Sequence, residues 1–299
     1  MPAGILLVDK PSGLTSHDVV ARVRRLAGTR KVGHAGTLDP MATGLLVLGL
    51  ESATRLLHYV VGLDKEYVAT VWLGRSSTTD DAEGELGDAA SPEAIAAVND
   101  ERILEAMAAL SGDIQQVPSS VSAIKVNGER AYARVRAGEA VELAARPVTV
   151  GVFELVGRRS TADRIELDVR VECSSGTYIR ALARDLGDAL GVGGHLTMLR
   201  RTRIGRFDVA DAQTLDALLE GEPLAPIGAA DAAASALPIV RLTEAQTVDI
   251  GHGKRIPAES GPPGELVAGV SPNGRLVAIL ERRADTWKVA TGFPAEETS

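Results

Sequence analysis

The stretch GHAGTLDPMATGLLVLG, residues 33–49, joins a glycine-rich loop to a continuous apolar run. The apolar run at residues 45–50 is too short for a typical helix, so it predicts a buried strand. Asp39 is the only acid in this stretch, and it directly precedes Pro40. Because Asp-Pro pairs commonly start turns, this pair alone favours a structural role over a chemical one.

The segments around this stretch alternate irregularly between strand and helix patterns. Strands are predicted at residues 5–8, 67–73, 148–155 and 164–173. Helices are predicted at residues 16–26, 52–61, 100–110 and 178–190, with Ser16 as the expected cap of the first. No repeat is visible, so we expect a mixed α+β fold around a largely antiparallel sheet.

The composition of the sequence changes after residue 220, where alanine, proline and glycine become frequent. Residues 220–238, EGEPLAPIGAADAAASALP, suit a linker better than a core element. Short apolar runs separated by charged turns follow, as in a small β domain. We therefore expect a first domain at residues 1–230 and a small β-rich domain at residues 237–299.

Composition bounds the chemistry. The single cysteine, Cys173, can form neither an internal disulfide nor a thiolate zinc site, and the five histidines lack the short spacings of metal ligands. We therefore expect a metal-free mechanism.

No apolar run reaches the roughly 20 residues of a membrane helix, and no basic segment leads into an apolar one at the N-terminus. This predicts a cytoplasmic protein without membrane contact.

The net charge of −8 argues against a nucleic-acid partner, but the distribution of charge reverses that interpretation. Two acid-free segments, residues 19–38 and 195–206, carry the basic side chains Arg22, Arg24, Arg25, Arg30, Lys31, Arg200, Arg201, Arg203 and Arg206. Acids gather elsewhere, above all in residues 76–113. The basic segments predict a face for RNA, and an ordinary solvated surface is an equally good interpretation from composition alone.

Further blocks accompany the Asp39 loop in a fixed order: DKPSGLTSHDVV at residues 9–20, DKEYVATVWLG at 64–74 and CSSGTYIRALARDLG at 173–187. In these blocks the chain resembles the bacterial TruB-type tRNA pseudouridine synthases, over about residues 5–207. The resemblance implies an α+β catalytic domain with a PUA-like C-terminal domain. It also implies that the substrate is a uridine in the T-loop of tRNA, at position 55, and that neither a cofactor nor an obligate protein partner is needed. We expect a monomer.

The resemblance also assigns roles to individual residues. Asp39 matches the catalytic aspartate, Tyr67 a tyrosine that stacks near the uracil and helps remove a proton, and Arg180 an arginine that pairs with the catalytic carboxylate. The implied substrate-binding residues are His34, which fills the place of a flipped nucleotide, together with Lys10, Tyr178 and Asp81. Lys10 could bond loop carbonyls or meet a phosphate, and the sequence does not choose between these two roles.

The chain departs from the family pattern in three loops. Ser119 stands where many relatives carry a second proline, the segment GLESATR after residue 48 lacks an expected glycine, and Thr78 replaces an acid. These departures put loop conformation, and with it the role of Asp81, in doubt rather than the reaction.

The chemistry can be argued without the resemblance. Conversion of uridine to pseudouridine breaks one glycosidic bond and forms another, so a carboxylate that stabilises the sugar cation is the central requirement. A guanidinium nearby would keep that carboxylate ionised. Two other classes remain open: an RNA-binding or RNA-folding protein, and a metabolic enzyme that binds small phosphates. The second of these predicts a phosphate loop with a Lys-Ser or Lys-Thr signature, which the sequence lacks.

Overall fold

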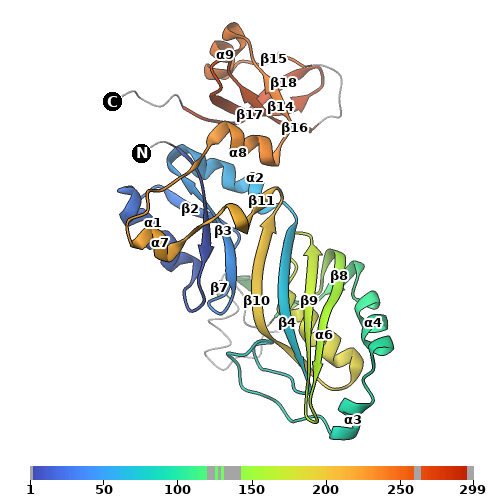
Figure 1. Ribbon diagram of the computed structural model, residues 1–299. Coiled ribbons are helices and arrows are strands. Elements are labelled where there is room, and N and C mark those ends of the chain that lie inside the picture. The colour runs from blue at the N-terminus through green and yellow to red at the C-terminus, as the bar shows by residue number, and fades with distance from the viewer. Residues whose placement is uncertain (1–2, 120–124, 127–128, 131–142, 259–263, 295–299) are drawn as a thin grey trace. The chain divides into compact units, whose positions relative to one another are not determined.

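The computed structural model describes residues 3–119, 125–126, 129–130, 143–258 and 264–294 (Figure 1). The chain forms two compact units. Unit 1 combines Met1–Leu63 with Arg203–Ser299, and unit 2 is Asp64–Thr202. Unit 1 is therefore assembled from both ends of the sequence, and unit 2 from its middle.

Unit 1 is organised around β1 (Gly4–Lys10) and β3 (Thr43–Leu50), which pair antiparallel. The strand β2 (Val32–Ala35) pairs with β3, β12 (Gln213–Thr214) runs parallel to β1, and β13 (Ile227–Gly228) is antiparallel to it. Alternate residues of β3 enter two separate apolar clusters, Leu45 and Val47 one, Leu46 and Leu48 the other. Both faces of β3 are thus buried, which explains why its sequence is a continuous apolar run.

The helix α1 (Ser16–Ala27) begins and ends at clear signals. A capping box joins Thr15 to Asp18, and Gly28 ends the helix with a left-handed φ of 64°. The prediction that Ser16 caps this helix is wrong, because Thr15 does so and the Ser16 hydroxyl binds the backbone of Leu38 instead. The predicted helix at residues 52–61 forms as a 3₁₀ turn, η1 (Glu51–Leu56), followed by α2 (Leu57–Val61).

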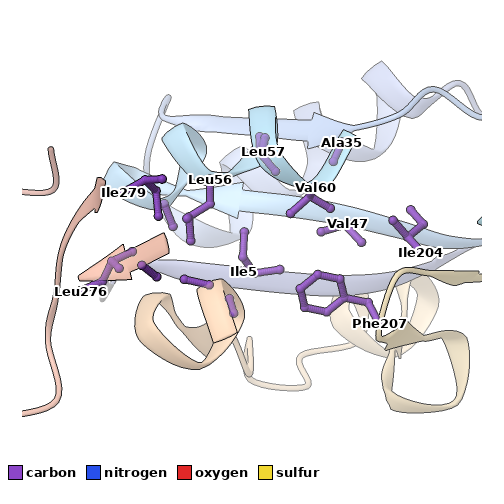
Figure 2. Close-up of a cluster of buried hydrophobic side chains, with 14 of the residues drawn as sticks. Ile5, Ala35, Val47, Leu56, Leu57, Val60, Ile204, Phe207, Leu276 and Ile279 are labelled. Carbon is purple, nitrogen blue, oxygen red and sulfur yellow. The ribbon is translucent and has the colours of Figure 1, made fainter. Parts of the chain in front are cut away.

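In the segment interpreted as a linker, residues 220–238, the second half instead forms a helix with one face in the core. This helix is α8 (Ala229–Ala236), where Ala232 and Ala233 are each 1% exposed. Their cluster includes Ile5 of β1 and Ile279 of the C-terminal sheet (Figure 2). The linker interpretation is wrong because alanine, although common in linkers, is also the strongest helix former and is small enough for close packing.

The last part of unit 1 is a small sheet, as predicted. Its strands in spatial order are β14 (Ile239–Arg241), β16 (Leu266–Val270), β17 (Leu276–Arg283), β18 (Thr286–Gly292) and β15 (Ile256–Pro257). The helix α9 (Glu244–Gly251) carries a capping box from Thr243 to Gln246. The remaining short elements of unit 1 are β11 (Phe207–Asp208), η2 (Val209–Asp211) and α7 (Leu215–Leu219). The boundary expected between residues 230 and 237 stays a prediction.

Unit 2 contains an antiparallel sheet covered by helices. Its strands are β10 (Gly194–Ile204, shared at its end with unit 1), β4 (Lys65–Leu73), β9 (Ile165–Cys173), β8 (Arg146–Ser160) and β5 (Gly112–Gln116), in that order (Figure 1). The helices are α3 (Pro92–Ala96), α4 (Asp100–Ala109) and α6 (Ile179–Leu190). Two short strands of unit 2, β6 (Lys125–Val126) and β7 (Glu129–Arg130), pair antiparallel with each other. In the main sheet β1 runs parallel to β12, whereas β1 is antiparallel to β3, β4 to β9, and β8 to both β9 and β5. The expected largely antiparallel α+β fold is confirmed.

The two faces of this sheet differ in polarity. In β4 and β9 alternate residues are buried, and the intervening ones are partly exposed. On the exposed face Arg170 pairs with Glu66 at 3.1 Å and Glu154 at 2.9 Å, and also with Glu172. This alternation is the expected pattern for an antiparallel sheet with one covered face. In the described part of the chain, no helix is long and apolar enough to cross a membrane.

Candidate active-site residues

Asp39 lies in the loop between β2 and β3 of unit 1, and the backbone is held on both sides of it. The Ser16 hydroxyl accepts a hydrogen bond from Leu38 N at 2.8 Å and lies 3.1 Å from Leu38 O, to which it can donate. Pro40 O accepts from Gly13 N at 2.8 Å. Gly13 of the β1–α1 loop and Ser16, the first residue of α1, therefore fix the path of the chain through Asp39, which is itself half-buried.

Lys10 supports the same loop from within the core. Its side chain is fully buried, and Nζ donates to Pro11 O at 2.9 Å, Leu14 O at 2.7 Å and Pro40 O at 3.3 Å. A buried ammonium is tolerated only when its donors are satisfied in this way. Of the two roles that the sequence left open for Lys10, the structure shows bonding to loop carbonyls.

His34 lies on β2, opposite Leu48 of β3, and its ring contacts a second histidine. The rings of His34 and His17 are 5.4 Å apart and meet edge to face at 82°. His17 is exposed on the first turn of α1. Nothing in the sequence had singled out His17, because the contact joins two different elements.

Arg180 and Asp81 form a buried ion pair in unit 2. Their side chains are 5% and 3% exposed, and Arg180 Nη1 lies 3.2 Å from Asp81 Oδ2. Arg180 also donates to Thr79 O at 2.9 Å, while Asp81 Oδ1 accepts from the Thr79 hydroxyl and from Glu83 N at 3.1 Å. Removal of one partner from such a pair is costly because the other charge stays buried.

The two tyrosines lie on the same unit. Tyr67 is 8% exposed on the covered face of β4, together with Ala69 and Val71, so the prediction that these three share a face is confirmed. Tyr178 is the half-buried N-cap residue of α6. Its backbone is held by Gln116, a residue that the sequence did not identify.

The acid beside Asp81 is also tied to α6. Asp80 has a left-handed φ of 61°, and its carboxylate lies 3.1 Å from Arg184 Nη1. Burial raises the pKa of Asp80, and the guanidinium of Arg184 opposes that rise. Arg180 and Arg184 are one helical turn apart, so together they hold consecutive acids of this loop.

The basic segments are only partly exposed. In unit 1 most of these side chains are exposed: Arg24, Arg25, Arg30, Lys31 and Arg206. Arg24 also donates to Val32 O at 2.8 Å. In unit 2, Arg201 is 1% exposed. The expectation that Arg201 contributes to an RNA-facing surface is therefore wrong, because its charge is buried within the fold.

Seven predicted site residues thus form two groups. Unit 1 holds Asp39 with Lys10 and His34 near its loop, and unit 2 holds Arg180 joined to Asp81, with Tyr67 and Tyr178. Ser119, one of the departures from the family pattern, donates to Thr79 O at 3.2 Å. Cys173 is buried.

Three family models match consecutive parts of the chain. The N-terminal domain of TruB family pseudouridylate synthases matches residues 24–179. The C-terminal domain of tRNA pseudouridylate synthase B matches residues 180–224, and the C-terminal region of tRNA pseudouridine synthase II matches residues 237–294.

Curated relatives agree over almost the whole length. The tRNA pseudouridine synthase B of Leifsonia xyli subsp. xyli is 60% identical over 297 residues, which cover 99% of this chain and 98% of the relative. The tRNA pseudouridine synthase B of Thermobifida fusca is 54% identical over 300 residues, covering 98% of this chain and 99% of the relative.

Solved structures show the same fold. A chain of an H/ACA ribonucleoprotein bound to a substrate RNA containing 2′-deoxyuridine superposes with a TM-score of 0.71 at 26% identity, covering 98% of this chain and 86% of that one. A chain of an archaeal box H/ACA ribonucleoprotein complex gives a TM-score of 0.71 at 27% identity, with 98% and 87% covered. With family models and near-full-length relatives in agreement, this chain belongs to the TruB family of pseudouridylate synthases and is an isomerase of uridine.

Proposed function

We propose that the chain isomerises a uridine in the T-loop of tRNA, at position 55, and that Asp39 is the nucleophile once this uridine is flipped out. The relatives from L. xyli and T. fusca are tRNA pseudouridine synthases, which supports tRNA as the substrate. The position within tRNA rests on the sequence resemblance. The observation that carries the role of Asp39 is the double anchoring of its loop by Ser16 and Gly13, because a carboxylate that must reach one atom needs a fixed backbone.

The reaction balances within the nucleotide. The N1–C1′ bond breaks, the base rotates, and a C5–C1′ bond forms, while N1 gains a proton and C5 loses one. Asp39 attacks either C1′ of the sugar, where it stabilises the electron-poor carbon as N1 departs, or C6 of the base, where it adds to the C5–C6 double bond and is later eliminated. No electrons are gained or lost overall, so the atom balance requires no redox cofactor.

The remaining residues take distinct roles in this proposal. Tyr67 stacks on the uracil and takes the proton from C5, and Tyr178 lines the pocket. Arg180 favours the ionised carboxylate, and Asp81 orients Arg180 through the buried ion pair. His34 fills the gap that the flipped nucleotide leaves, and Lys10 holds the Asp39 loop.

Residues 237–299 are proposed to form a PUA-like domain that adds contacts to tRNA. Support comes from the match of residues 237–294 to a C-terminal model of the family. The enzyme would act on tRNA as a monomer without an obligate protein partner.

Pseudouridine mapping in a T-arm stem-loop RNA tests both the position and the nucleophile. The wild-type protein should convert one uridine, and Asp39→Asn should lower the single-turnover rate by roughly a thousandfold or more while RNA affinity stays unchanged. Asp88→Asn, at an exposed acid of unit 2, is the matched control and should behave as wild type. Conversion elsewhere in the loop would refute the position, and an Asp39→Asn rate within about tenfold of wild type would refute the nucleophile.

A further inference from the structure

Gln116, the last residue of β5, is 1% exposed and directs its side chain at the backbone of a single residue. Tyr178 N donates to Gln116 Oε1 at 2.8 Å, and Gln116 Nε2 donates to Tyr178 O at 3.0 Å. The glutamine side chain therefore satisfies the donor and the acceptor of one peptide residue together, as a neighbouring strand would.

This contact lies at the point where α6 begins. Tyr178 is the N-cap residue, and its side chain makes no capping hydrogen bond. Tyr178 O also accepts the first helical hydrogen bond, from Leu182 N at 3.2 Å. Gln116 thus satisfies the N–H of the N-cap residue, one of the free donors at the start of a helix, and it fixes the start of α6 two residues before Arg180.

A second hydrogen bond joins the same two elements six residues further along the chain, within α6. Arg184 Nη2 donates to Val117 O at 2.8 Å, and Val117 directly follows Gln116. Arg184 also pairs with Asp80, whose neighbour Asp81 pairs with Arg180. The end of β5 is therefore connected to the helix face that carries Arg180.

We propose that Gln116 is a positioning residue for the isomerisation: it holds the Tyr178 backbone so that Tyr178 and Arg180 keep their reactive orientation. Gln116 does not touch the substrate in this proposal. The inference rests on the proposed roles of Tyr178 and Arg180. Small errors in the placement of reacting groups cost large factors in rate, so the contribution of Gln116 should appear in turnover rather than in RNA binding.

The experiment compares Gln116→Glu and Gln116→Met with the same substitutions at Gln115, which is exposed on the same strand. Gln116→Glu keeps an acceptor for Tyr178 N but places a second oxygen against Tyr178 O. We expect the single-turnover rate to fall about 10- to 100-fold for both Gln116 variants, with T-arm affinity within about threefold of wild type. Both Gln115 variants should keep wild-type rates.

A coupling measurement separates positioning from general stability. If Gln116 acts through Arg180, the double variant Gln116→Glu with Arg180→Lys should lose less than the product of the two single losses. Thermal unfolding of every variant is measured in parallel, and assays are run well below the lowest midpoint. Multiplicative losses, or a folded Gln116→Glu protein with the wild-type rate, would overturn the proposal.

The controls also distinguish failure of this inference from failure of the proposed function. A wild-type protein that converts the T-arm uridine, an inactive Asp39→Asn and a fully active Gln116→Glu would remove the role of Gln116 alone. A wild-type protein that makes no pseudouridine would remove both.

Discussion

Replacement of Lys10 by methionine tests whether the Asp39 loop depends on the buried ammonium. Methionine fills a similar volume but donates no hydrogen bond, so Pro11 O and Leu14 O lose the donor that Lys10 supplies, while Pro40 O keeps Gly13 N. A buried carbonyl without its donor costs about 1–3 kcal/mol. Because the substitution also removes the cost of burying a charge, we expect a net loss of about 2–4 kcal/mol in the unfolding free energy of unit 1.

Urea unfolding in a Trp72→Phe background provides the measurement, because the chain has 2 tryptophans and Trp287 then reports on unit 1 alone. Lys31→Met is the control: Lys31 is 75% exposed and pairs with Glu51 at 3.3 Å, so its loss should change stability by at most about 0.5 kcal/mol. RNA binding at several salt concentrations completes the test. Unchanged stability of Lys10→Met together with a salt slope reduced by about one phosphate contact would show that Lys10 meets the RNA backbone.

Three more outcomes are expected. Burial next to Arg201 lowers the pKa of Lys65 to about 8, so above that pH the unfolded state binds more protons than the folded state. The free energy of unfolding, measured by urea titration in a Cys173→Ala background, should therefore rise between about pH 8 and 10. Lys65→Met should remove this rise. The Cys173→Ala background is needed because burial raises the pKa of that thiol to about 11, which acts in the opposite direction, and a flat profile with Lys65 present would contradict the assignment. T-arm affinity should fall at least tenfold between about 50 and 200 mM salt in filter binding, and a nearly flat dependence would exclude a basic RNA-binding face. A chain that ends at Ala236 should melt at a lower temperature than the full chain, because Ile279 and Phe293 share a core with β1, and an equal calorimetric midpoint would refute this.

The strands of the fold were predictable where burial imposes a period on the sequence. The alternation of β4 and the apolar run of β3 follow directly from one covered face and two covered faces. The cap of α1 was predicted one residue late, because Thr15 and Ser16 are both capping residue types and only their contacts separate them. The helix α8 was missed because its composition fits a linker and a packed helix equally well.

The candidate site residues could be predicted from sequence motifs, but the contacts that support their side chains and backbone could not. The pair of Arg180 with Asp81 and the clamp of Gln116 on Tyr178 join residues about 60 to 100 positions apart, and sequence spacing carries no information on such contacts. A lone glutamine at the end of a strand has no pattern that distinguishes it from a surface residue. The burial of Arg201 was likewise invisible, because a run of basic letters does not show which side chain points inward.

The division of unit 1 between both ends of the chain sets an order of events during synthesis. Residues 64–202 are complete on the ribosome before β1 can meet β12 and β13, since Gly4 pairs with Gly228 and Val8 with Gln213. The cluster that includes Ile5 closes only when residues 204–293 have been made, about 90 residues later and roughly 5–20 s at bacterial elongation rates. Until residues 213–228 have been made, the edge of β1 that will receive β12 and β13 is open to other strands. Substitutions that weaken α8 or β13 should therefore lower the yield of folded protein by aggregation of nascent chains before they affect turnover.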